Sequence, residues 1–187
     1  YNGKTFEGGL IAYFAKDVSC VIDFLTTLSK NDPNHLFYNK LNLDRLGAFG
    51  VSLGGIIVSE ASWKDPRIKA NLIMESRIPQ KIAQTGLRVP TMVITRPAEA
   101  MRIERERSGG WTENDIQEHL STMENLCENT PESEFVQIPN IFHVDFTDAP
   151  LWVPFAHSLG FSGKTPFAQT HDELNQLTLA FFEEYLQ

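Results

Sequence analysis

The sequence predicts an α/β fold in which a mostly parallel sheet is flanked by helices. The main observation is an alternation along the chain between helical periodicity and short apolar runs. Short apolar runs bounded by turn-forming residues are typical of buried strands. The 187 residues are enough for one domain with a buried core, and that domain is expected to span residues 1–187. The predicted strands are 46–49, 70–74, 89–95 and 135–138.

Helices are predicted before, between and after these strands. In 10–30 the apolar residues recur at steps of three and four, so one face of this helix is expected to be buried. That face comprises Phe14, Val18, Val21, Ile22, Leu25 and Leu28. A second buried helix is expected over 54–63, directly after the first strand. Two later helices are expected to begin with the spacing of a capping box, at Thr112 with Asp115 and at Thr170 with Glu173.

The composition excludes several classes of function. A formal net charge of −8 argues against nucleic-acid binding, which selects a basic face, and against simple adhesion to anionic membranes. No apolar run reaches the length of about 18 residues that a transmembrane helix needs. Cys20 and Cys127 are too few to define a disulfide framework, so cysteine usage leaves the cellular compartment open.

Residues 46–61 read LGAFGVSLGGIIVSEA and contain the pattern Gly-x-Ser-x-Gly at Gly50, Ser52 and Gly54. A nucleophile elbow needs a strand, a tight turn and a helix, so that the serine hydroxyl projects above the sheet. Side chains at the two glycines are expected to collide across such a turn. The backbone N–H of Leu53 would point at a developing oxyanion. We therefore predict that Ser52 is a nucleophile, the alternative being a glycine-rich turn in another α/β fold.

A serine nucleophile needs a histidine base that a carboxylate orients. In this arrangement the acid and the histidine follow the serine along the chain, which excludes His35. His143 directly follows the fourth predicted strand, in NIFHVDF, and is the preferred base. His157 lies in the same long loop and stays open. His119 and His171 fall on predicted helices and are expected at the surface.

Two carboxylates compete for the role of the acid. Glu75 ends the strand that follows the nucleophile helix, so its carboxylate would share a sheet edge with Ser52. Glu99 follows the next strand and is the alternative acid. Asp145 and Asp148 lie so close in sequence to the proposed base that orienting its ring would be awkward.

Five segments carry a family resemblance: FAKDVSCVIDFL before the elbow, GVSLGG at it, NLIMES after the next strand, FHVDFTDAP at the base and LAFFEEYL at the end. With them the chain resembles an α/β-hydrolase, and more narrowly the platelet-activating-factor acetylhydrolase group and its bacterial dienelactone-hydrolase-like relatives. The resemblance implies serine-dependent hydrolysis of esters, including short acyl chains on phospholipids, without a metal or other cofactor. It implies Glu75 as the acid, where the family usually has Asp. It permits a secreted or periplasmic location as well as a cytoplasmic one.

The resemblance also implies that part of the fold lies outside this chain. In the α/β-hydrolase fold a second oxyanion donor comes from a loop after the third strand. The chain starts near the helix just before the elbow strand. We therefore expect the C-terminal portion of the fold, completed by a companion N-terminal chain or segment packed against 46–49. Without it, a sheet edge would be left unpaired.

The predicted function is hydrolysis of a small-molecule ester through an acyl-enzyme. Residues 98–130 lie between the third and fourth strands and are expected to form a charged helix or a cap hinged at Gly109–Gly110. Aromatic residues of the later loop are candidates for substrate binding, with core packing as the alternative: Phe142, Phe146 and Trp152. An acyltransferase or thioesterase with the same triad, and a non-catalytic binding protein with this fold, are the other hypotheses.

Overall fold

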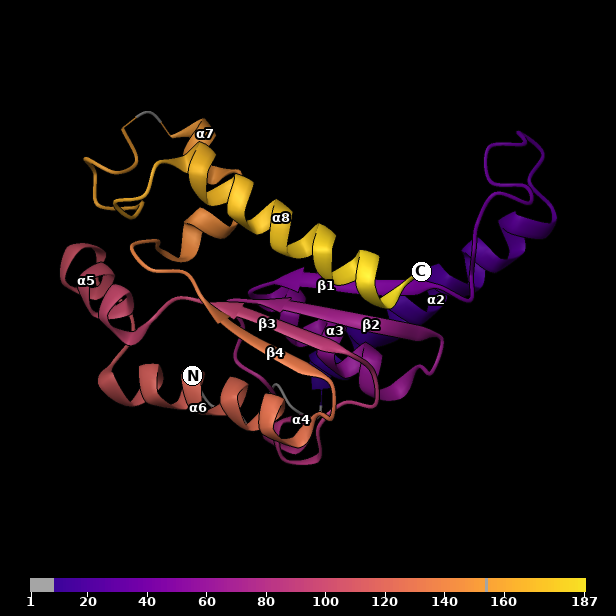
Figure 1. Cartoon of the computed structure of the whole chain (residues 1–187), viewed down its shortest axis with the longest axis horizontal. Helices are drawn as coiled ribbons and strands as arrows, with labels where there is room; N and C mark the ends of the chain where they lie inside the picture. Colours follow the sequence, from indigo (N-terminus) through magenta and orange to yellow (C-terminus); the bar gives the residue numbers. More distant parts are fainter. Residues whose placement is uncertain (1–8, 154) are drawn as a thin grey trace.

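The computed structural model describes residues 9–153 and 155–187. They form a four-stranded sheet in which every strand is parallel to its neighbours, in the order β1-β2-β3-β4 (Figure 1). The strands are β1 (Leu46–Val51), β2 (Ile68–Met74), β3 (Thr91–Thr95) and β4 (Ser133–Gln137). The predicted α/β fold with a mostly parallel sheet is therefore confirmed.

Helices cover both faces of the sheet. Helix α8 lies on one face, and α3, α4 and α6 lie on the other (Figure 1). The longer helices are α2 (Ile11–Lys30), α3 (Leu53–Lys64), α5 (Ala98–Ser108), α6 (Glu113–Asn129) and α8 (Phe167–Tyr185). The short ones are α4 (Gln80–Thr85), η2 (His143–Phe146) and α7 (Ala149–Trp152). Among the described residues, no helix is both long enough and apolar enough for a membrane span.

The inner strand β2 is apolar over residues 72–74 because both of its faces are covered there. Leu72 and Met74 face a core that includes Phe181 of α8, whereas Ile73 faces a second core that includes Met123 of α6. This alternation follows from the two-residue period of a strand. The parallel register then brings the carboxyl ends of the strands to one edge of the sheet, where the candidate site lies.

Strand β1 lies at the edge of the sheet, and β2 is its one neighbouring strand within the described ranges. The prediction of a buried strand is wrong for Phe49, whose side chain is 61% exposed. The reason is that its ring meets α8 only at the end of that helix, edge-on against Phe182 with 6.5 Å between ring centroids. Phe49 therefore presents an apolar side chain to solvent on this edge strand.

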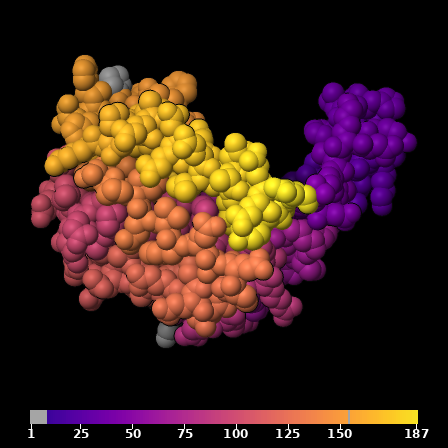
Figure 2. All heavy atoms as spheres, viewed as in Figure 1, coloured from indigo at the N-terminus to yellow at the C-terminus, as the bar shows by residue number. Residues whose placement is uncertain are grey.

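Helix α2 begins one residue after the predicted range 10–30 and buries a narrower face. Ile11, Ala15 and Ile22 are buried, whereas Val21, expected in the core, is 56% exposed. The reason is that α2 packs mainly on α3, so only one stripe of its surface is covered. The end of α2 and the loop after it project from the body of the molecule (Figure 2).

One of the two predicted capping boxes is present. At the start of α6 the Asp115 N–H donates to Thr112 Oγ1 (3.2 Å), and the Thr112 N–H donates to Asp115 Oδ2 (2.8 Å). The box predicted at Thr170 is wrong, because α8 already begins at Phe167, directly after Pro166. Pro166 fixes φ and has no N–H to satisfy, which suits the start of a helix. Thr170 is buried inside the helix.

The segment 98–130 divides into two parts. Helix α6 packs Met123 and Leu126 against the sheet and is therefore one of its covering helices. Helix α5 and the glycines after it lie at the carboxyl edge of the sheet (Figure 1). Gly109 and Gly110 have φ angles of 77° and 114°, which glycine adopts at little cost. The α6 part of the segment 98–130 packs on the sheet, and a cap formed by α5 and this glycine pair stays a prediction.

Candidate active site

Ser52 occupies a strained turn between β1 and α3. Its φ and ψ are 55° and −119°, a conformation that residues other than glycine rarely adopt. Hydrogen bonds hold it there: the Ser52 N–H donates to the Met74 carbonyl (2.9 Å), and the Gly55 N–H donates to the Ser52 carbonyl (3.0 Å). The Ser76 hydroxyl donates to the same carbonyl. Strain that the surroundings enforce in this way is typical of functional sites, and the strand–turn–helix arrangement has the geometry expected of a nucleophile elbow.

Close backbone approach at the elbow requires two glycines. A Cβ at Gly50 would lie 2.3 Å from the carbonyl carbon of Gly54, and one at Gly55 would lie 2.6 Å from Ser76 Cβ. The expectation for Gly54 itself is wrong, since among the described residues a Cβ there meets no atom within 4 Å beyond its chain neighbours and the backbone of its own helix. Gly54 is a helical residue that faces open space, whereas Gly50 and Gly55 face backbone and a neighbouring strand end.

Gly50→Ala is therefore expected to destabilise the fold by about 3 kcal/mol, because the added methyl group overlaps backbone that cannot move aside. The measurement is the free energy of unfolding in urea. Gly54→Ala is the matched control and should be neutral or stabilising by up to about 1 kcal/mol, since alanine is favoured in helices. Equal losses in the two variants would contradict the proposed turn geometry.

Glu75 lies at the end of β2 and is almost fully buried. Its Oε2 accepts a hydrogen bond from Thr95 Oγ1 (2.8 Å), and its Oε1 accepts one from Arg96 Nε (2.8 Å). Arg96 is also buried and forms a further ion pair with Glu104 of α5. Burial acts to raise the pKa of Glu75, but the nearby imidazole of His143 and the charge of Arg96 outweigh it and lower the pKa to about 2. The carboxylate is therefore ionised and held in one orientation.

His143 begins η2, just after β4, and its Nδ1 lies 3.7 Å from Glu75 Oε1. This distance exceeds that of a formed hydrogen bond, but catalytic contacts are often longer in the absence of substrate. Asp145 holds the turn that carries the histidine. Its carboxylate accepts from the N–H groups of Phe142 and Gly163 (both 2.7 Å) and from the Ser162 hydroxyl (2.6 Å).

Ser52 and His143 line the same two adjoining cavities, of about 500 and 300 Å³. Trp111 and Gly110 also line both. The larger cavity is completed mainly by Leu53, Ile56, Arg77, Asp115 and His119, and the smaller one by Arg96, Met101, Glu104, Arg105 and Gly109. Sequence reasoning missed Trp111, although a tryptophan between a glycine pair and a capping box was the signal that could have found it.

His119 corrects a prediction. It was expected at the surface, but its side chain is only 2% exposed and its Nε2 lies 3.6 Å from Glu75 Oε1. Its ring packs edge-on against Trp111, with 4.6 Å between centroids. Burial lowers the pKa of His119 to about 4, against the opposing effect of Glu75. The periodicity contained a signal, because His119 follows Ile116 by three positions and precedes Met123 by four, on the buried face of α6.

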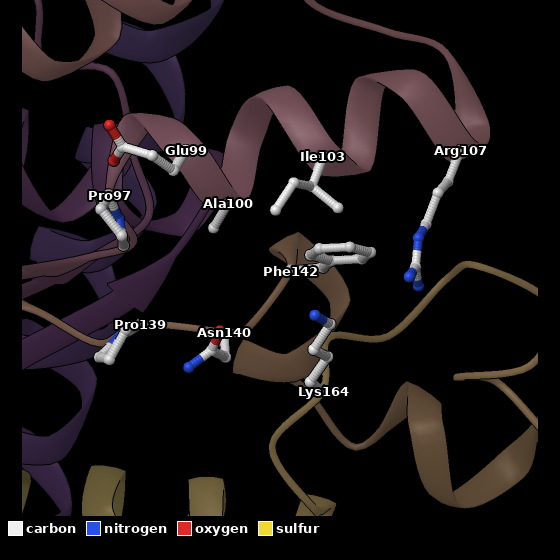
Figure 3. Close-up of a pocket in the computed structure, with 9 residues that line it drawn as sticks. All are labelled: Pro97, Glu99, Ala100, Ile103, Arg107, Pro139, Asn140, Phe142 and Lys164. Carbon is white, nitrogen blue, oxygen red and sulfur yellow. The ribbon is translucent and has the colours of Figure 1, made fainter.

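Glu99, the alternative acid, is placed away from Ser52 and His143. Its side chain is 75% exposed and lies 3.6 Å from Arg102. It lines a third cavity, of about 120 Å³, on another side of α5 (Figure 3). The first turn of α5 directs this carboxylate outward, whereas Glu75 is held inward by Thr95 and Arg96.

The three aromatic candidates for substrate binding do not line the cavities at Ser52. Phe142 lines the third cavity, together with Ile103 and Lys164 (Figure 3). Phe146 is buried in the core under α8, and Trp152 is 82% exposed on α7. The reason is the course of η2 and α7, which turns one aromatic ring toward the sheet and another toward solvent. His157 also lines neither cavity, because its Nδ1 lies 2.7 Å from the Gly163 carbonyl oxygen.

Within the described ranges, no side chains are arranged to bind a metal ion, and the two cysteines form no disulfide. Glu75, His119 and His143 converge, but the described residues include no cluster of three or more such side chains arranged to hold a metal ion. Cys20 and Cys127 are both free thiols. Burial raises the pKa of Cys127 to about 11, so this thiol is unreactive at neutral pH.

No protein-family model matches the chain, and no curated protein matches its sequence. Among solved structures, the chain is similar to a ferulic acid esterase from Streptomyces cinnamoneus, with a TM-score of 0.70 and 22% sequence identity. The match covers 96% of this chain and 49% of the esterase, so the chain spans about half the length of that protein. At this level of identity the likeness shows that the two share a fold.

Proposed function

We propose that this chain carries the catalytic residues of a serine-dependent carboxylic ester hydrolase. The observation that supports the proposal most is a convergence at one sheet edge: Ser52 follows β1, Glu75 follows β2 and His143 follows β4. Along the chain the three residues occur in the order serine, acid, histidine, as in an α/β-hydrolase triad. The shared fold with a ferulic acid esterase is a second, weaker support.

The proposed mechanism proceeds through an acyl-enzyme. His143 removes the hydroxyl proton of Ser52, whose oxygen attacks the ester carbonyl to form a tetrahedral oxyanion. Glu75 stabilises the resulting imidazolium, and the Leu53 N–H, in the first turn of α3, donates to the oxyanion. The imidazolium then returns its proton to the departing alcohol. Water, activated in the same way by His143, releases the acid and restores Ser52.

A further segment is proposed to complete the site along β1. Phe49 is exposed on this edge strand, Leu53 is 45% exposed beside it, and a Cβ at Gly54 would face open space. We propose that a companion chain, or another segment of the same protein, pairs with β1 and supplies the second oxyanion donor. The match to only half of the esterase is consistent with this proposal.

The substrate is proposed to be a small-molecule ester with an apolar acyl group. Leu53, Ile56 and Trp111 supply apolar surface to the larger cavity beside Ser52. Short acyl esters, including those of phospholipids, fit the resemblance drawn from the sequence. Helix α5 and the glycines that follow are proposed as a cap, because they contribute Met101, Gly109 and Gly110 to the cavity walls.

Covalent labelling with a fluorophosphonate tests this function, because the reagent reacts with activated serines and not with ordinary ones. We expect a single adduct, which peptide mass spectrometry maps to Ser52. Denatured protein is the control and should not be labelled. Failure of the folded protein to react, or an adduct at another serine, would favour a non-catalytic binding protein instead.

A further inference from the structure

The buried side chain of His119 places a second imidazole next to Glu75, the acid of the proposed triad. We propose that His119 is a positioning residue: its neutral ring donates to the Glu75 carboxylate and holds it in the orientation that faces His143. This inference rests on the proposed function, in which Glu75 and His143 act together with Ser52.

The geometry around one oxygen atom is the first support. Glu75 Oε1 accepts from Arg96 Nε at 2.8 Å, and two imidazole nitrogens lie at nearly equal distances from it. These are His119 Nε2 at 3.6 Å and His143 Nδ1 at 3.7 Å. The other oxygen, Oε2, is occupied by Thr95 Oγ1. Any rotation of the carboxylate toward His143 therefore also changes its distance to His119.

The unequal burial of the two rings is the second support. The side chain of His143 is 35% exposed, whereas that of His119 is 2% exposed. Within the described residues, both ring nitrogens of His119 are buried without a hydrogen-bond partner. An unpaired buried N–H is costly, so a slight approach of Nε2–H to Glu75 Oε1 is favourable. Trp111 fixes the plane of the ring from the cavity side, at 4.6 Å between centroids.

The charge state of His119 determines what it can do. With its pKa lowered to about 4, mainly by burial, the ring is neutral at neutral pH and has one N–H to donate. It can therefore orient Glu75 without adding a second positive charge next to Arg96. Besides Glu75 and the two histidines, the charged groups near the site are Arg77 and Asp115 in the larger cavity, Arg96 beside Glu75, and Glu104 and Arg105 on α5.

The expected consequence is a pH-dependent effect on the base. Donation from His119 withdraws negative charge from Oε1, so its loss lets His143 take up a proton more readily. The carboxylate keeps its bonds to Thr95 and Arg96 but loses the neighbour that restrains it beside His143, which loosens the alignment of the base. Loss of His119 should therefore lower the rate of Ser52 acylation and move the acidic limb of the pH–rate profile to higher pH.

The test compares rates of fluorophosphonate labelling at Ser52 between about pH 5 and pH 9 in wild type, His119→Leu and His119→Gln. The leucine variant should react about 10-fold to 100-fold more slowly, with its acidic limb shifted upward. The glutamine variant retains an amide N–H at a similar reach and should recover most of the rate. With a p-nitrophenyl ester, kcat should fall in the leucine variant while KM stays unchanged. His35→Gln, at an exposed histidine on the loop after α2, is the control.

Stability against pH gives an independent readout. The unfolded chain binds a proton at His119 near its ordinary pKa of 6.5, whereas the folded chain binds it near 4. The unfolded state is therefore favoured as pH falls through this window, and wild-type unfolding free energy should decline from pH 6.5 toward pH 4. His119→Gln should lack this part of the decline. If the unfolding free energies of wild type and His119→Gln changed with pH in parallel, His119 would not be the neutral, buried group on which the inference depends.

Four further results would overturn the proposal. A changed KM with an unchanged pH profile in the leucine variant would make His119 a substrate contact. Equal rate losses in the leucine and glutamine variants, with parallel losses of stability, would make it purely structural. If wild type is labelled and neither variant reacts more slowly, the inference about His119 is refuted but the proposed function is not. If wild type is not labelled at all, the proposed function and the inference are both refuted. Should the leucine variant not fold, His119→Asn, whose amide is too short to reach Oε1, replaces it.

Discussion

Ser52→Ala is expected to abolish ester hydrolysis, with kcat/KM for a p-nitrophenyl ester falling by about 10³-fold to 10⁶-fold. The serine oxygen is the atom that forms the acyl-enzyme, and no nearby side chain in the elbow can replace it. The backbone at this position is held by bonds to Met74 and Gly55, which the variant keeps. The loss should therefore be one of chemistry, with the circular dichroism spectrum and the urea midpoint nearly unchanged.

The matched control for this variant is Ser121→Ala. Ser121 is an exposed residue of α6 whose hydroxyl donates to the Glu118 carbonyl in its own helix (3.2 Å). Its removal should leave kcat/KM within about twofold of wild type, as expected for surface substitutions. Activity retained in Ser52→Ala would exclude the acyl-enzyme mechanism, whatever the control shows.

Glu75→Gln is expected to lower kcat/KM by about 10³-fold to 10⁴-fold, the second largest effect. The amide is similar in size to the carboxylate, but it carries no charge to stabilise an imidazolium at His143. Its NH₂ group can also face Nδ1 and favour the wrong tautomer of the base. The measurement is the same hydrolysis assay, run alongside Glu99→Gln.

Glu99→Gln separates the two candidate acids. Glu99 is exposed and paired with Arg102, so its neutralisation should change activity by less than about twofold. A larger loss for Glu99→Gln than for Glu75→Gln would reverse the assignment. Glu75→Gln also leaves Arg96 with Glu104 as its remaining carboxylate, so some stability is lost. Activity should therefore be measured well below the thermal midpoint of this variant.

The sequence by itself determined the local backbone and the order of its elements. The apolar run before Gly50 and the small residues after it dictate a strand, a turn and a helix, because these preferences act over a few neighbouring residues. Ser52, Glu75 and His143 could be nominated for the same reason, since each stands directly after or at the end of a predicted strand. Parallel strands bring such positions to one edge whatever their detailed packing.

Only the tertiary structure decided which side chains meet. Glu75 and Glu99 both follow strands, but only Glu75 is held inward by Thr95 and Arg96. His119 lies 44 residues after Glu75 in the sequence yet 3.6 Å from its carboxylate, because α6 returns across the sheet. Phe146 and Trp152 are both aromatic residues of one loop, but one is buried and the other exposed. Contacts of this kind depend on the packing of distant elements, which local sequence patterns do not encode.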